Sequence, residues 1–467
     1  MYTNLPIIPH VFRKHGTSLQ LTGVRLVGSR CKHIGLTVAL SFISCSVLLL
    51  AAENDATWYP KSQSEMKAML TVLAPQRDAN DRMKEDYIQR LKMYRYVCDV
   101  AFEDLGWDDE YAKLAHHASL ICSKLNKLTH NPEQPAGMSD EDYALGKRGA
   151  GQSNLFMGRT EPAGCVDGWM DDSDDSNIDR VGHRRWCLNP KMLKSAFGTV
   201  GNYAAMYAFD NSLKTVREWD YVAYPTRGYM PIDLFGGHYA WSVSLNMGKY
   251  ATPSKGEVTA TIQPVDDKFK SVGSVLELNY FNVETGGFGS GTAIIFRPKS
   301  FSVQSDTRYK VNIRGVKTKE GLPAVIEYLV HYVDIRKAPD TPDGKRIVSD
   351  FLRKRLDSAK AMTDRVDQLD ALIAFTEQEL VKTVDPSLAK EAKTMIVEML
   401  KDPVLKKEQT AAQKYQQVVD LEKKAGDHKK TLVNVAATYR EFAKIYKGTR
   451  AASKADADFE RLKLALQ

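Results

Sequence analysis

Residues 168–190 read GWMDDSDDSNIDRVGHRRWCLNP, and this stretch decides how the chain around it is interpreted. It predicts a helix at residues 166–170, then an acidic loop, then a second short helix that carries His183. The second helix ends before Pro190, because proline cannot continue it. Gly182 leaves bare backbone beside the imidazole of His183, so another group can approach this histidine closely.

Two further patterns precede this stretch. Residues 107–130 read WDDEYAKLAHHASLICSKLNKLTH and predict a long helix with one apolar face and Asp108 as its N-cap. His130 lies at the helix exit, where the free carbonyl ends favour an imidazolium or a bound cation. A third motif, GQSNL, follows at residues 151–155.

Together the three motifs resemble the signatures of the CAP superfamily of SCP-like extracellular proteins, which includes cysteine-rich secretory and plant pathogenesis-related proteins. The second signature of its bacterial secreted branch runs roughly Gly-Trp-Met, Val-Gly-His-Arg, Leu-Asn-Pro and Phe-Gly, and residues 168–198 match it. The GQSNL motif occupies the place of the family's Gly-Glu-Asn-Leu. The resemblance covers residues 85–212 and implies an α/β/α sandwich there.

The resemblance also implies a cleft with a defined set of side chains. In the family two histidines face each other across this cleft together with two acids, and the matching positions are His130, His183 and, for one acid, Asp172. The fourth position falls at Gln152 or Ser153, where animal members have glutamate. Two histidines and one carboxylate suffice for Zn²⁺ with water in the open position, but no obvious general base remains. The other side chains expected around the cleft are Asn154, Arg184 and Trp169.

Two functions from different classes follow. The favoured one is an extracellular or envelope binding module whose cleft holds a divalent metal, or a protein, peptide or lipid-like ligand, without chemistry. The alternative is a metal-dependent hydrolase in which His130, His183 and Asp172 hold Zn²⁺ and activate water. The chain contains no His-Glu-x-x-His helix and no Gly-x-Ser-x-Gly elbow, which weakens the enzyme hypothesis. A third interpretation treats the histidines as a structural hydrogen-bond cluster.

The acidic loop and the arginines beside it carry separate expectations. Oxygen donors as dense as those of Asp171, Asp174 and Asp175 suit Ca²⁺, although the loop lacks the glycine and glutamate of an EF-hand. A solvated loop without calcium is the alternative. Arg184 could orient a carboxylate or phosphate, or pair with the acidic loop instead.

The start of the chain predicts export. Residues 1–33 carry several basic residues and no acid, and residues 34–52 run without a charge. Residues 1–52 are therefore interpreted as a basic leader with a signal peptide, or with an uncleaved single-pass membrane anchor. The protein is expected to be secreted or to reside in the cell envelope. The net charge of +7 is spread over 467 residues without a basic block, so no nucleic-acid partner is expected.

Export bears on the cysteines outside the leader. Disulfides form in oxidising compartments, and four cysteines allow three pairings between which the sequence does not choose. Each bridge would stabilise the fold by about 2–4 kcal/mol. Four buried free thiols are the alternative. The cysteines concerned are Cys98, Cys122, Cys165 and Cys187.

The remaining chain predicts an α+β protein with further parts on either side of the CAP-like domain. Residues 53–84 are interpreted as a linker with a short helix. Alternating residues and turn signals predict an antiparallel, Ig-like β-sandwich at 213–337, in which GGFGSG at 286–291 is a flexible hairpin tip. A hinge is expected at 338–346, and an all-α, tetratricopeptide-like domain at 347–467.

Overall fold

The structure is a computed structural model, and it describes residues 58–74, 82–426 and 428–466. The predicted leader at 1–52 lies outside these residues. Within them, no helix combines the length and the apolar character that crossing a membrane requires.

The CAP-like part is built around a small antiparallel sheet in the order β2-β5-β4. Its strands are β2 (Ser153–Met157), β4 (Phe197–Val200) and β5 (Tyr203–Tyr207), and the short β1 (Gly106–Trp107) and β3 (Lys194–Ser195) pair in parallel beside it. Its helices are α3 (Arg82–Val97), α4 (Asp109–Leu125), α5 (Asp140–Gly151), α6 (Pro162–Asp171) and α7 (Gly182–Cys187).

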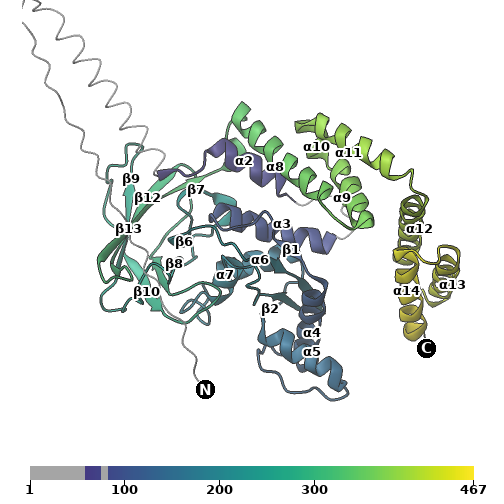
Figure 1. Cartoon of the computed structure of the whole chain (residues 1–467). Coiled ribbons are helices and arrows are strands. Elements are labelled where there is room, and N and C mark those ends of the chain that lie inside the picture. Colours follow the sequence, from purple (N-terminus) through teal and green to yellow (C-terminus); the bar gives the residue numbers. More distant parts are fainter. Residues whose placement is uncertain (1–57, 75–81, 427, 467) are drawn as a thin grey trace, which may run out of the picture. The chain divides into compact units, whose positions relative to one another are not determined.

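Helices cover both faces of this sheet, as predicted. Successive side chains of a strand point to opposite faces, and β5 shows this directly. Ala205 packs in a core with Ile121 of α4, whereas Met206 packs in a different core with Trp169 of α6. The helices α4 and α5 pack against each other beside the sheet (Figure 1). The sheet therefore forms the middle layer of an α/β/α arrangement.

The next part consists of two four-stranded sheets, in the orders β10-β11-β8-β6 and β7-β13-β12-β9. Their strands are β6 (Tyr221–Tyr224), β7 (Gly228–Pro231), β8 (Trp241–Leu245), β9 (Thr259–Val265), β10 (Leu278–Glu284), β11 (Ala293–Pro298), β12 (Thr307–Lys317) and β13 (Pro323–Val333), with the 3-10 helices η1 (Ile232–Leu234) and η2 (Ile335–Lys337). Side chains from both sheets, such as Phe296 and Tyr328, share one core. We call this part the β-sandwich.

The β-sandwich differs from the prediction in one pairing. The contact between β7 and β13 is parallel, whereas the other pairs within the two sheets are antiparallel. The Ig-like topology stays a prediction.

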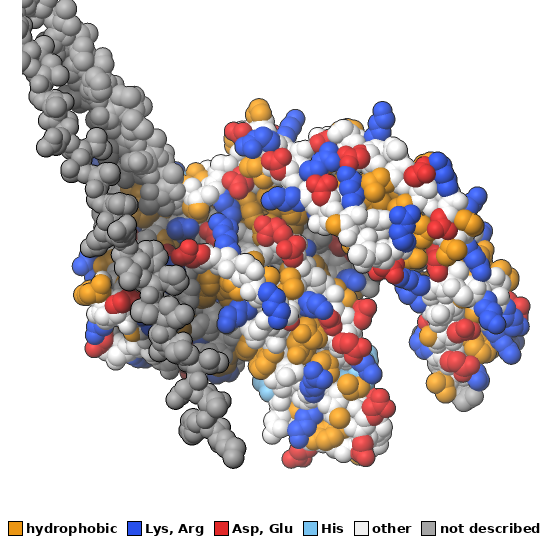
Figure 2. Space-filling model, viewed as in Figure 1, with side chains coloured by type: hydrophobic (Ala, Val, Ile, Leu, Met, Phe, Trp, Pro, Cys, Tyr) orange, Lys and Arg blue, Asp and Glu red, His pale blue; other side chains and the backbone are white. Residues whose placement is uncertain are grey.

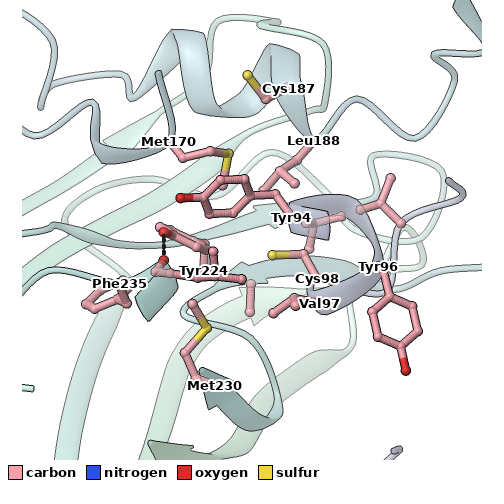
Figure 3. Close-up of a cluster of buried hydrophobic side chains, with 14 of the residues drawn as sticks. Tyr94, Tyr96, Val97, Cys98, Met170, Cys187, Leu188, Tyr224, Met230 and Phe235 are labelled. Atoms are coloured by element: carbon pink, nitrogen blue, oxygen red, sulfur yellow. Dashed lines mark hydrogen bonds between the residues drawn. The ribbon is translucent and has the colours of Figure 1, made fainter. Parts of the chain in front are cut away.

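The CAP-like part and the β-sandwich share one apolar core, which Figure 3 shows. Tyr94 of α3 and Cys98, the residue after its end, lie between Met170 of α6 and the side chains of Tyr224 and Met230 from the β-sandwich (Figure 3). All five side chains are almost completely buried. The boundary predicted near residue 212 is therefore not a boundary between hydrophobic cores.

Helices make up the last part of the chain. They are α8 (Pro342–Lys360), α9 (Arg365–Glu377), α10 (Glu379–Val384), α11 (Pro386–Met399), α12 (Pro403–Ala425), α13 (Lys429–Ile445) and α14 (Arg450–Leu466). Pro386 and Pro403 each stand in the first turn of a helix, where proline is tolerated, and Gly426 caps α12. On the face shown in Figure 2, basic and acidic side chains are interspersed over these helices.

Two features of this part concern the predicted linkers. Helix α8 begins at Pro342, inside the predicted hinge. The short helix predicted in the first linker is α2 (Gln63–Val72), which lies beside α8 (Figure 1) and adds Met66 and Met69 to the shared core. In the last helices, Tyr439 of α13 and Ala455 of α14 share a core with Ala411 of α12. The helix pair α13 and α14 is thus completed by the neighbouring helix α12.

Candidate functional site

The two predicted histidines are each held by a hydrogen bond at the same ring nitrogen, Nδ1. His183 lies half-buried on α7, and its Nδ1 is 2.7 Å from Oδ1 of Asp172. His130 is exposed after α4, and its Nδ1 is 2.8 Å from the carbonyl oxygen of Ala150. Carboxylate and carbonyl oxygens only accept hydrogen bonds, so Nδ1 carries the proton in both rings. In the neutral imidazoles each Nε2 then presents a lone pair.

The structure places Asp172 in the wall of the cleft, behind His183. The residue is 3% exposed, and its second oxygen accepts the backbone N–H of Arg184 at 3.2 Å. It caps α6 in the left-handed conformation, with φ 46°, and Val181 enters α7 in the same conformation, with φ 40°. Two non-glycine residues held in this sparsely populated region fix both ends of the acidic loop. Asp172 is therefore a positioning residue for His183.

A cleft with two lobes surrounds the histidines. One lobe, of about 490 Å³, is lined partly by the acidic loop, and we call it the acidic-loop lobe. The other, of about 380 Å³, is lined by several aromatic side chains, and we call it the aromatic lobe. Both volumes lie in the range of small-molecule sites. The lobes share four residues, here called the waist: His130, Asn177, Arg180 and His183.

Arg180 is the charged residue of the waist that sequence reasoning missed. Its side chain is exposed, and its guanidinium reaches only the side-chain oxygen of Asn177, at 3.5 Å. Within the described residues it forms no ion pair. An arginine without a carboxylate partner is available to bind an anion in the cleft. Its place in the quoted stretch, three residues before His183, was the signal that could have found it.

The predicted three-ligand zinc site does not fit these residues. In the described part of the chain, no three His, Cys, Asp or Glu side chains converge on a metal position. Both carboxylate oxygens of Asp172 are already used, so the waist offers two imidazoles. The hydroxyl of Tyr207 donates to the side chain of Gln152 at 3.1 Å, and Ser153 is buried. Neither Gln152 nor Ser153 therefore supplies the general base that is missing from the family's set of residues.

The acidic loop does not form a calcium cage in the structure, because its carboxylates face different partners. Asp171 lies 2.9 Å from Nε2 of His238, in the β-sandwich. Asp174 accepts hydrogen bonds from Ser176 within its own turn, at 2.9 Å for the backbone N–H. Asp175 is exposed. The loop is a network of local turns that is also hydrogen-bonded to the β-sandwich, through Asp171, Ser173 and Asp179.

The other predicted cleft residues act mainly as supports. The side-chain amide of Asn154 donates to the backbone carbonyl of His183 at 3.0 Å and so ties β2 to α7. The indole of Trp169 lines the acidic-loop lobe but donates to the carbonyl of Leu155 at 3.1 Å. The Ser153 hydroxyl is buried in the wall of the aromatic lobe and has no hydrogen-bond partner in the structure.

Arg184 does not face the cleft. It is 1% exposed, and its guanidinium donates to the carbonyl oxygens of Met170 and Ala240, each at 2.7 Å. Its neighbour Arg185 donates to the carbonyl oxygen of Gly286 at 2.6 Å. Burial lowers the pKa of both guanidinium groups, that of Arg185 to about 10. The two arginines of the signature therefore attach α7 to the β-sandwich.

The glycine-rich loop at 286–291 is packed against α7 instead of forming a free tip. Gly289 has φ 69°, and a Cβ there would lie 2.8 Å from the carbonyl oxygen of Arg185. The guanidinium of Arg185 lies over the ring of Phe288, with its Cζ 5.1 Å from the ring centroid. A Cβ at Gly182 would lie 3.0 Å from this ring. The group that approaches Gly182 closely is thus part of the β-sandwich.

The four cysteines are free thiols in the structure, and all are buried. They lie in different surroundings: Cys122 points to the carbonyl of Thr129, Cys165 to that of Arg159, and Cys187 to the sulfur of Met206, while Cys98 lies in the shared core. Among the described residues no pair of cysteines is bridged, so the structure shows the alternative of four buried free thiols and not the expected disulfides. Burial raises the pKa of Cys98 and of Cys165 to about 12, which suppresses the reactive thiolate.

Comparison with known proteins gives one match. No curated protein and no solved structure matches the chain. Residues 101–222 match the family model described as "CAP: Cysteine-rich secretory protein family". The matched range contains α4, the sheet, the acidic loop and both histidines. The family match therefore supports the CAP superfamily for this part of the chain, which holds most of the cleft.

Proposed function

We propose that this chain is an exported interaction protein of the bacterial secreted CAP branch, whose cleft binds a small anionic ligand without converting it. The single observation that carries the proposal is the waist. It combines an exposed arginine that has no carboxylate partner among the described residues with two imidazoles held through Nδ1. Export rests on the basic leader at 1–52 and agrees with the secretory description of the matched family.

The waist suits an anion for a definite reason. The guanidinium of Arg180 presents a planar set of N–H donors that matches a carboxylate or phosphate. His183 lies beside Arg180 at the waist, and Asp172 fixes the orientation of its ring through Nδ1.

A metal-dependent hydrolase is the second candidate, and one observation favours it. Metal-ligating histidines commonly donate their other ring nitrogen to a carboxylate or a carbonyl, as His130 and His183 do. The missing third protein ligand and general base argue against it. Metal content measured by mass spectrometry on the full chain, with His130→Ala and His183→Ala beside the wild type, tests it. Stoichiometric zinc that is lost in both variants would favour the hydrolase.

Calorimetric titration of the full chain with 1-naphthoate tests the binding proposal. This probe joins a carboxylate to a flat apolar group. Arg180→Gln is expected to weaken its binding about tenfold, which corresponds to the loss of one charge-assisted contact. Arg314→Gln is the matched control, because Arg314 is also exposed and donates to an asparagine side chain, at 3.0 Å from Asn312. No binding to the wild type, or equal losses in both variants, would overturn the proposal.

A further inference from the structure

We infer that the loop at 286–291 of the β-sandwich forms one wall of the binding cleft, and that Phe288 makes the cleft select anions that carry a flat apolar group. The inference rests on the proposed binding function and adds to it a second domain and a ligand class. Gly287 and Phe288 line the aromatic lobe together with residues of the CAP-like part. The site is therefore composite.

The aromatic lobe presents apolar rings to an open cavity. Trp186 and Phe209 are stacked, with ring centroids 4.2 Å apart and an interplanar angle of 23°. Phe209 is nevertheless 41% exposed, although burying such a side chain is favourable. Phe288 adds a third ring from the β-sandwich. Aromatic rings around a cavity of about 380 Å³ suit a ligand group of one or two rings.

The loop is held in place before any ligand arrives. The guanidinium of Arg185 donates to the carbonyl oxygens of Gly286, Ser290 and Gly291 and thereby holds the loop at both ends. Between them, the close approach of Gly289 to α7 leaves no room for a side chain. A wall that is already ordered costs little conformational entropy on binding. Phe288 is therefore positioned to contribute to affinity.

A polar group in the same lobe also lacks a partner. The Ser153 hydroxyl belongs to a residue that is 3% exposed and lines the aromatic lobe, and no hydrogen-bond partner is found for it in the structure. An unpaired buried hydroxyl is unfavourable, but this oxygen is enclosed in the wall, so the apolar rings and not Ser153 define the ligand body. With Arg180 at the waist, these features describe an anionic head followed by a flat, mainly apolar body.

Binding of 1-naphthoate and of benzoate to the full chain distinguishes the contribution of the anionic group from that of the flat apolar group. Phe288→Ala is expected to weaken naphthoate about fivefold to tenfold and benzoate less than twofold, because only the larger body reaches the ring of Phe288. Arg180→Gln should weaken both ligands alike. Phe288→Leu, which keeps an apolar side chain, should recover part of the naphthoate affinity. Leu322→Ala is the matched control, since Leu322 is 62% exposed and lies outside both lobes.

The outcomes distinguish this inference from the function on which it rests. Naphthoate binding that depends on Arg180 but not on Phe288 would overturn the composite site and leave the proposed function standing. Absence of naphthoate binding would overturn both. Thermal melting of each variant verifies that the chain is folded. An octapeptide ending in tryptophan, with a free or an amidated carboxyl group, distinguishes a protein C-terminus from a free aromatic acid as the source of this chemistry.

Discussion

The junction between the CAP-like part and the β-sandwich differs in kind from the attachment of the last helices. At the junction an apolar core is shared, and the buried Arg184 and Arg185 donate to backbone carbonyls across it. Most of α12–α14 forms a core of its own, although Leu405 at the start of α12 packs in the core of the preceding helices. Arg450 contacts Asp364 and Asp367 with side chains that are 46–57% exposed. Exposed ion pairs contribute little. We therefore expect the junction to unfold cooperatively and the last helices to unfold with little coupling to it.

The strongest test of this comparison is Arg184→Met. The substitution removes the buried guanidinium together with its hydrogen bonds. The carbonyl oxygens of Met170 and Ala240 then lose the donor that Arg184 provides. We expect the free energy of unfolding to fall by about 3–5 kcal/mol. Urea unfolding followed by tryptophan fluorescence and by circular dichroism measures it. A fall below 1 kcal/mol would show that the junction does not depend on this cation.

Gly289→Ala tests the attachment of the loop. The added Cβ meets the carbonyl oxygen of Arg185, and alanine disfavours the observed φ of 69°. A loss of about 2 kcal/mol is expected, with weaker naphthoate binding. Gly287→Ala is the control for stability two residues away, because a Cβ there has no neighbour within 4 Å. Equal losses in both variants would contradict a packed loop.

The β-sandwich should be sensitive to acid through His331. Burial lowers its pKa from 6.5 to about 4, so the folded state binds the proton less readily than the unfolded state. The stabilisation is fully present above pH 6.5 and is lost as the pH falls toward 4. Its size is about 1–2 kcal/mol after allowance for solvent screening. Urea unfolding midpoints of the wild type and of His331→Phe, each at pH 7 and at pH 4.5, measure it. If the lower pH shifts both midpoints by the same amount, His331 is not the cause.

Arg450→Ala should have the smallest effect. Its two ion pairs lie at the surface, so the expected loss is at most about 1 kcal/mol and should shrink further in 1 M salt. Hydrogen exchange of α13 and α14 provides the measurement. A large, salt-independent loss would mean that the last helices are coupled to the rest of the protein as strongly as the junction is.

The sequence predicted the features that local patterns encode. The short helix with His183 and the N-cap at Asp108 follow from helix start and stop signals, whereas the α/β/α layers were implied by the resemblance to the CAP superfamily. The pattern did not indicate that Arg185 reaches Gly286, because the two residues are 101 positions apart. Spacing also could not distinguish a metal ligand from a carboxylate behind a histidine, which is what Asp172 is. That distinction depends on which atoms are already hydrogen-bonded.

The end of the family match has a consequence for how this domain can be inherited. Residue 222 lies inside β6, and β6 pairs with β8 of the β-sandwich. A gene segment cut at that point would encode a domain whose two arginines lack their acceptors in the β-sandwich, and it would leave an open strand edge behind. Recombination could therefore move the pair of domains as one unit far more easily than it could move the CAP-like part alone.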